Sequence, residues 1–125
     1  MKIDMMEKHP LGSQAFIPME DTKFLVFVAP KGDKPDVNKI QSFLVPKQTG
    51  VNYNAGIWHF PLISMKDMNY LIVDINGKRN NLVIYRFKKY KNGKKCLMNF
   101  SYASNNNKEF LKISQLKEII KKDNF

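Results

Sequence analysis

Two short polar segments hold the residues best suited to chemistry in this chain. The first contains Glu7 and His9, and the second contains His59, the other of only two histidines. Side chains alternate between the faces of a β-strand, so Glu7 and His9 would lie on the same face. A carboxylate beside an imidazole can act as an acid–base pair or as two ligands of one metal ion. A surface pair just before a turn is the simpler interpretation of an isolated Glu-x-His.

The second segment places the single tryptophan, Trp58, directly before His59. Neighbouring residues of a strand face opposite ways, so one ring would line the interior while the other packs outward or into a second layer. Alone, such a pair is more often core packing. A fold that brings His9 and His59 together would favour a site.

Composition narrows the class of protein. The chain has 125 residues, 43% of them hydrophobic, which suits one packed domain. Its one cysteine, Cys96, cannot form an intrachain disulfide, and the start lacks the apolar stretch of a signal peptide. No apolar run approaches the length of a membrane span. We therefore expect a cytoplasmic protein that does not associate with membranes, and an inert Cys96.

Short apolar segments bounded by glycine and proline predict a mostly β protein. Strands are expected at residues 3–7, 14–19, 23–29, 40–45, 56–62, 69–74, 82–90 and 96–102. Residues 35–38 predict a helical turn, residues 50–54 predict a polar turn, and Pro61 is expected to break its segment. Asn76-Gly77 and Asn92-Gly93 predict hairpin turns. This pattern is typical of an antiparallel barrel or a double-sheet jelly roll.

The end of the chain differs from the rest. From Ser114, apolar residues recur at helical spacing, which predicts a short C-terminal helix. Residues 86–125 hold eleven of the 21 basic residues and three of the 11 acidic ones. We expect residues 1–85 to form the core, with residues 86–125 packed on it as a basic extension of a hairpin plus a helix. Nucleic-acid binding by this extension is the less favoured alternative, because its apolar periodicity suits a fold and its basic residues are almost all lysine.

Both polar segments resemble the ureidoglycolate lyase family. Residues 7–19, EKHPLGSQAFIPM, are similar to its first signature, and residues 50–62, GVNYNAGIWHFPL, are similar to its second. Residues 34–36, the strand at 40–44 and residues 71–74 follow the same pattern. The match covers about residues 3–80. Two long signatures in the right order are a specific signal.

The resemblance implies a cupin-like β-barrel, usually a homodimer. It implies cleavage of ureidoglycolate, or a similar 2-hydroxy acid, to glyoxylate and urea in allantoin and purine catabolism. Cupin metal ligands would correspond to Glu7, His9, Gln14 and His59, and the presence of a divalent metal is left open. Glu7, His9 and His59 would be catalytic, with Glu7 or His59 as base and His9 as acid. The remaining candidates, expected to bind substrate, are Ser13, Gln14, Asn52, Tyr53 and Trp58.

Some features depart from the family pattern. Family chains normally have a further segment before the first signature, and Asn54 and Phe60 stand where many members have histidine. We expect residues 86–125 to supply replacement strands and a second copy of the chain to cover exposed edges. Two other functions remain open. One is a non-catalytic, truncated cupin that binds a small carboxylate or ureido ligand, and the other is a basic protein that binds nucleic acid or a protein partner.

Overall fold

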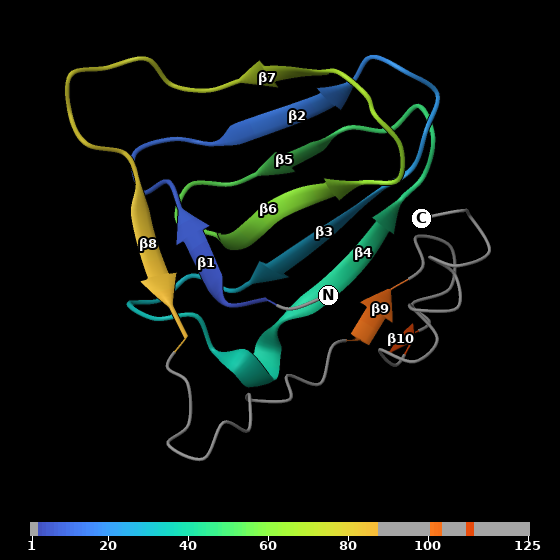
Figure 1. Cartoon of the computed structure of the whole chain (residues 1–125). Coiled ribbons are helices and arrows are strands. Elements are labelled where there is room, and N and C mark those ends of the chain that lie inside the picture. Colours follow the sequence, from blue (N-terminus) through green and yellow to red (C-terminus); the bar gives the residue numbers. More distant parts are fainter. Residues whose placement is uncertain (1–2, 88–100, 104–109, 112–125) are drawn as a thin grey trace.

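The computed structural model describes residues 3–87, 101–103 and 110–111, and these form two facing β-sheets (Figure 1). The larger sheet has the strand order β10-β9-β4-β3-β6-β1-β8. Its strands are β1 (Met5–Lys8), β3 (Phe24–Ala29), β4 (Gln41–Val45), β6 (Trp58–Ser64), β8 (Val83–Arg86), β9 (Ser101–Ala103) and β10 (Phe110–Leu111). The smaller sheet has the order β5-β2-β7, with β2 (Gln14–Pro18), β5 (Val51–Tyr53) and β7 (Tyr70–Val73).

The predicted antiparallel, mostly β fold is confirmed. Every strand pair in the described part is antiparallel except β4 with β9, which is parallel. The sheets face each other as in a cupin-like fold, but they do not close into a barrel. A single turn of 3-10 helix, η1 (Val37–Lys39), occupies the predicted helical turn, and the Asp36 side chain accepts a hydrogen bond from Asn38 N at its start.

The core has two parts because the larger sheet is apolar on both faces. Leu25, Phe27 and Trp58 pack on its outer face, in a cluster that draws no residue from the smaller sheet. Phe24 and Val26 point the other way, into a second cluster shared with Tyr53 of the smaller sheet. The near-continuous apolar sequence of β3 is therefore explained by burial on both faces.

Two predictions about the segments around β6 were wrong. Residues 50–54 contain the strand β5 in place of a polar turn, because Val51 and Tyr53 turn inward while Asn52 faces out. Pro61 does not break β6. The register of β6 against β3 shifts beside Pro61, between Leu25 and Phe27, and such an irregularity tolerates a residue that has no N–H to donate.

The predicted hairpin turn at Asn76-Gly77 was also wrong. Strand β7 pairs with β2 in the smaller sheet, whereas β8 pairs with β1 in the larger one. The intervening residues 74–82 form a connection that crosses between the sheets (Figure 1). The predicted helix after Ser114 and the predicted hairpin at Asn92-Gly93 lie outside the described residues. In the described part, no helix is long and apolar enough to cross a membrane.

Candidate active site and metal centre

The two signature segments meet where β1 pairs with β6. Glu7 and His59 are register partners in this antiparallel pair, and His9 follows directly after β1. Glu7, His9 and His59 each offer one ligand atom, and these atoms lie within 4.8 Å of one another. His59 Nε2 is 3.6 Å from Glu7 Oε1, and the two imidazole centroids are 5.2 Å apart. The structure thus brings together the three residues predicted to be catalytic.

Hydrogen bonds on the far side of each imidazole determine which nitrogen carries the proton. His9 Nδ1 lies 2.7 Å from the carbonyl oxygen of Asn81, and His59 Nδ1 lies 3.0 Å from that of Ile57. A carbonyl oxygen can only accept, so both Nδ1 atoms must be protonated. In the neutral imidazoles both Nε2 atoms are therefore lone-pair donors, and both are buried without a hydrogen-bond partner.

Gln14 presents an acceptor in the same way. Its Nε2 donates to Asp74 Oδ2 at 2.9 Å, and its Oε1 is buried without a partner. Gln14 and Tyr53 are register partners of β2 and β5, so their side chains share the inward face of the smaller sheet. The fourth predicted metal ligand therefore also has a free acceptor atom.

Burial controls the charge state of the rings. His59 is 2% exposed, and this burial, reinforced by His9, lowers the pKa of His59 to about 4 despite the bond to Ile57. Tyr53 stacks on His59 with centroids 4.1 Å apart and an angle of 7° between the rings. Burial, and next the negative charge of Glu7, raise the pKa of Tyr53. At neutral pH the site therefore holds a neutral His59 beside a neutral phenol.

The chemistry of these atoms fits a cation. In the described part, the buried side-chain polar atoms without a partner belong to His9, Gln14, Tyr53 and His59, all predicted site residues. The Glu7 carboxylate and the Nε2 atoms of the neutral imidazoles offer lone pairs, and the buried Gln14 Oε1 is a further unpartnered acceptor. Two imidazole nitrogens with a carboxylate form a ligand set that divalent transition metals bind, and the amide oxygen is a further donor. The residues present thus fit the metal that the cupin resemblance implies.

The side chains of the other residues predicted to bind substrate are either fully buried or exposed. Trp58 is fully buried on the outer face of the larger sheet, where its indole N–H donates to the Gly32 carbonyl oxygen at 2.9 Å. Asn52 is exposed and donates to Asn54, and Ser13 is also exposed. We leave the side chains of these three residues out of the proposed site.

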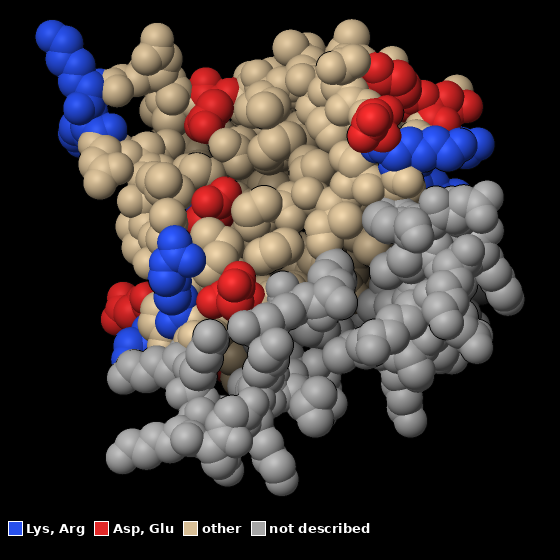
Figure 2. Space-filling view, in the orientation of Figure 1, with Lys and Arg blue, Asp and Glu red and all other residues tan. Residues whose placement is uncertain are grey.

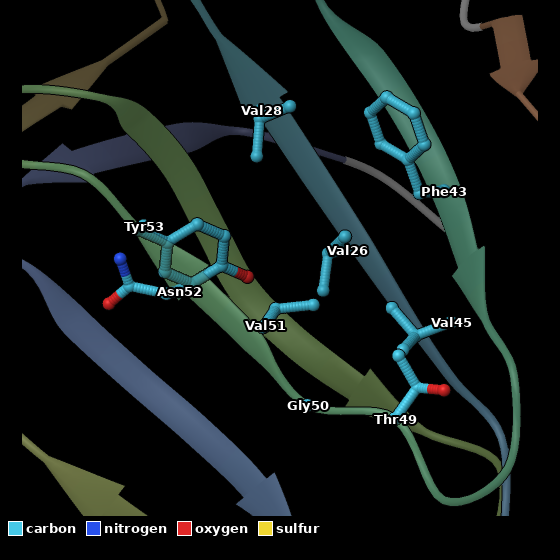
Figure 3. Close-up of a pocket in the computed structure, with 9 residues that line it drawn as sticks. All are labelled: Val26, Val28, Phe43, Val45, Thr49, Gly50, Val51, Asn52 and Tyr53. Atoms are coloured by element: carbon cyan, nitrogen blue, oxygen red, sulfur yellow. The ribbon is translucent and has the colours of Figure 1, made fainter. Parts of the chain in front are cut away.

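A groove lined in part by Tyr53 opens between β5 and the strands β3 and β4 (Figure 3). It measures about 280 Å³ and its walls are mainly the side chains of Val26, Phe43 and Val51. Figure 3 shows the Tyr53 hydroxyl turned toward Val26 and the Asn52 amide turned away from the groove. Tyr53, which stacks on His59, thus also lines this apolar space.

Sequence reasoning missed two residues that contact the cluster, Asp74 and Asn81. Asp74 accepts from Gln14, and Asn81 accepts from both His9 and the Leu11 N–H. They lie 60 and 72 positions from their side-chain partners. No spacing rule connects them, because only the crossing of residues 74–82 between the sheets brings them to the site.

An open two-sheet fold with a two-histidine, one-carboxylate cluster between its sheets is that of a cupin-like protein. The family model described as ureidoglycolate lyase matches residues 1–92. This chain belongs to that family. The match extends beyond the boundary of 85 expected for the core.

Curated relatives agree with the family model. A ureidoglycolate lyase of Pseudomonas fluorescens (strain Pf0-1) is 43% identical over 89 residues, covering 70% of this chain and 53% of the relative. Those of Pseudomonas paraeruginosa and Burkholderia mallei are 48% and 45% identical over 82 residues, covering 65% of this chain and 48% of each relative. The chain spans about half the length of the curated relatives it matches.

Proposed function

We propose that this protein is a ureidoglycolate lyase-type enzyme that releases glyoxylate and urea in allantoin and purine catabolism. The observation that carries the proposal is the convergence of Glu7, His9 and His59 within 4.8 Å. The family membership supplies the substrate class, and the cluster supplies groups able to bind it and move a proton.

The reaction needs one proton to be moved. The hydroxyl of ureidoglycolate loses its proton as the carbonyl of glyoxylate forms, the carbon–nitrogen bond breaks, and the departing urea nitrogen gains a proton. In a neutral imidazole whose Nδ1 carries the proton, Nε2 has no proton to give, so we propose Glu7 in place of the predicted acid His9. We assign both transfers to Glu7, which takes the proton from oxygen and returns it to nitrogen. Its side chain is 22% exposed, which makes it more accessible than His59.

The other site residues hold the substrate in place. A divalent cation held by Glu7, His9 and His59, with Gln14 as a further ligand, would withdraw electron density from the substrate's hydroxyl and offset its carboxylate charge. Glu7 would then use one carboxylate oxygen as ligand and keep the other for proton transfer. The backbone amides of residues 12–14 are candidates for binding the substrate's carboxylate.

A coupled glyoxylate-release assay tests this function, with the full chain measured after chelation and again with added Co²⁺. We expect turnover, and we expect Glu7→Gln to lower it by about 100-fold or more, within the range usual for loss of an acid–base group. Asp67→Asn, which neutralises an exposed carboxylate outside the cluster, should leave turnover unchanged. Binding of ureidoglycolate without any glyoxylate release would instead establish a non-catalytic binding protein.

We also propose that the chain forms a homodimer. Large apolar side chains are exposed along β7, in the segment that follows it and at the start of β8, namely Leu71, Ile72, Val73, Ile75, Leu82, Val83 and Ile84. Much of the described surface in Figure 2 carries no charged side chain. A second copy of the chain would cover such a surface and the edges of β7 and β8. Light scattering at increasing protein concentration tests this, and a monomer throughout would contradict it.

A cytoplasmic location completes the proposal. Its support is the cysteine content, because Cys96 has no partner within the chain for a stabilising disulfide. Fractionation of cells that express the full chain would test it.

A further inference from the structure

We propose that Asn81 is a positioning residue that fixes the His9 ring from the segment between β7 and β8. We call residues 74–82 the crossing segment. The inference rests on the proposed function for its catalytic meaning, because His9 belongs to the proposed site. Its structural content, which is the orientation and tautomer of His9, can be measured without any activity.

Asn81 accepts two hydrogen bonds from the first signature. Its main-chain carbonyl oxygen accepts the His9 Nδ1–H at 2.7 Å, and its side-chain Oδ1 accepts the Leu11 N–H at 2.7 Å. The side-chain bond anchors Asn81 to the backbone that follows His9, and this keeps the carbonyl in reach of the ring. The two bonds act together because they join the same two short segments.

The contact determines what His9 presents to the site. With Nδ1 bonded to a carbonyl, the proton stays on Nδ1, and the buried, unpartnered Nε2 keeps its lone pair for the site. A ring with the opposite tautomer would place an N–H among the ligand atoms and lose the ability to bind a cation. Outer partners of this kind typically change metal affinity by about 10–100-fold when removed.

Two other contacts support the same role for the crossing segment. At its first residue, Asp74 accepts from Gln14 Nε2, and Gln14 Oε1 stays buried without a partner. Ile75 lies so close to Gly12 that a Cβ on that glycine would be 3.0 Å from Ile75 Cγ2. The crossing segment thus contacts the first signature at Gly12, at Gln14 and around His9.

The first test measures the His9 tautomer by ¹H–¹⁵N NMR of the metal-free full chain, at a pH where both imidazoles are neutral. The chain has two histidines, so a His59→Gln sample assigns the spectrum. We expect the Nδ1–H form in the wild type and a substantial share of the Nε2–H form in Asn81→Ala. Asn81→Asp keeps an acceptor for Leu11 N–H and should restore the wild-type tautomer.

The second test measures Co²⁺ affinity of the same variants by its visible absorption. We expect Asn81→Ala to bind about 10-fold more weakly or worse, with Asn81→Asp within about threefold of the wild type. Asn80→Ala is the matched control, because the Asn80 side chain accepts a local hydrogen bond from the Leu82 N–H at 3.2 Å. Asn81→Ser replaces Asn81→Ala if circular dichroism shows that the alanine variant is unfolded.

An unchanged His9 tautomer and unchanged Co²⁺ affinity in folded Asn81→Ala would overturn the proposal. Equal losses in Asn80→Ala would also overturn it, because the effect would then be a general loosening of the crossing segment. Absence of lyase activity in the wild type would defeat the proposed function alone, and the tautomer measurement would still decide the role of Asn81.

Discussion

His9 and His59 owe their free Nε2 lone pairs to hydrogen bonds made outside the cluster. The same-face placement of Glu7 and His9 follows from strand alternation and was predictable from two positions in the sequence. Pairing of His59 with Glu7 depends on the register of β1 against β6, which no spacing rule predicts. The family resemblance implied only that the two segments meet. The choice of tautomer depends on the carbonyl groups of Ile57 and Asn81, so it required the folded structure.

Replacing His59 tests the cluster most directly. We expect His59→Gln to lower glyoxylate release by about 100-fold or more and to weaken Co²⁺ binding, because a ligand nitrogen is lost from a group of three. The glutamine side chain approximates the volume of the buried ring, so the variant should remain folded. Steady-state kinetics and circular dichroism check this. A folded variant with full activity would remove His59 from the site.

His59 also predicts how stability depends on pH. Its pKa falls from about 6.5 in the unfolded chain to about 4 in the folded protein, so between these values the unfolded state binds more protons. The contribution of His59 is therefore fully present above about pH 6.5 and is lost as pH falls toward 4. The full shift corresponds to about 3 kcal/mol.

Urea unfolding of the metal-free protein between pH 4 and 7 measures this effect. Carboxylates titrate in the same range, so the relevant quantity is the difference between the wild type and His59→Gln. We expect the wild type to lose stability more steeply than the variant as the pH falls. Parallel curves would contradict the lowered pKa of His59.

At the scale of elements, most strands could be predicted from apolar segments bounded by glycine and proline. Strand β5 did not, because its one outward residue, Asn52, and the surrounding glycines give it the composition of a turn. The antiparallel pairing of β5 with β2 stabilises the extended conformation that its local sequence does not predict. Pro61 caused the opposite error, because it predicted a break where β6 is continuous. The shift in register between β6 and β3 accommodates a residue that normally ends a strand.

Gly50 tests the approach of β5 to β2. A Cβ at this position would lie 2.9 Å from the main-chain oxygen of Phe16, which cannot move without disturbing β2. We expect Gly50→Ala to lower the free energy of unfolding by about 1–3 kcal/mol, as overpacking typically does. The matched control is Gly77→Ala, since a Cβ there meets nothing within 4 Å. Urea unfolding of both variants makes the comparison, and equal stability would show that β2 yields at no cost.

At the scale of the whole molecule, the basic extension takes part in the sheet. Strand β9 pairs with β4, with Gln41 opposite Ser101 and Ser42 opposite Tyr102. This pairing supports the proposal that residues 86–125 serve the fold. The apolar periodicity of the extension predicted that it packs on the core. It did not predict that β9 pairs in parallel with a strand some 60 positions earlier.

Deleting residues 88–125 tests that role while leaving β8 intact. We expect the shortened chain to aggregate or to unfold at a lower temperature, because β4 loses its neighbour and becomes an exposed edge. Size-exclusion chromatography and thermal unfolding check this. A stable, soluble core, together with tight and salt-sensitive binding of DNA or RNA by the full chain, would instead favour the nucleic-acid alternative.

The division of the site between two sheets has a consequence for detecting its ligand. Glu7 and His59 belong to the larger sheet, whereas Gln14 and Tyr53 belong to the smaller one, and the described sheets do not share a hydrogen-bonded ladder. A ligand that contacts both groups would act as a cross-link between the sheets, and mass action would convert its affinity into resistance to heat. At 100 times its Kd such a ligand adds about 2.7 kcal/mol. Melting curves collected against a panel of ureido compounds and 2-hydroxy acids would then rank candidate substrates, even for a chain whose turnover is too slow to follow.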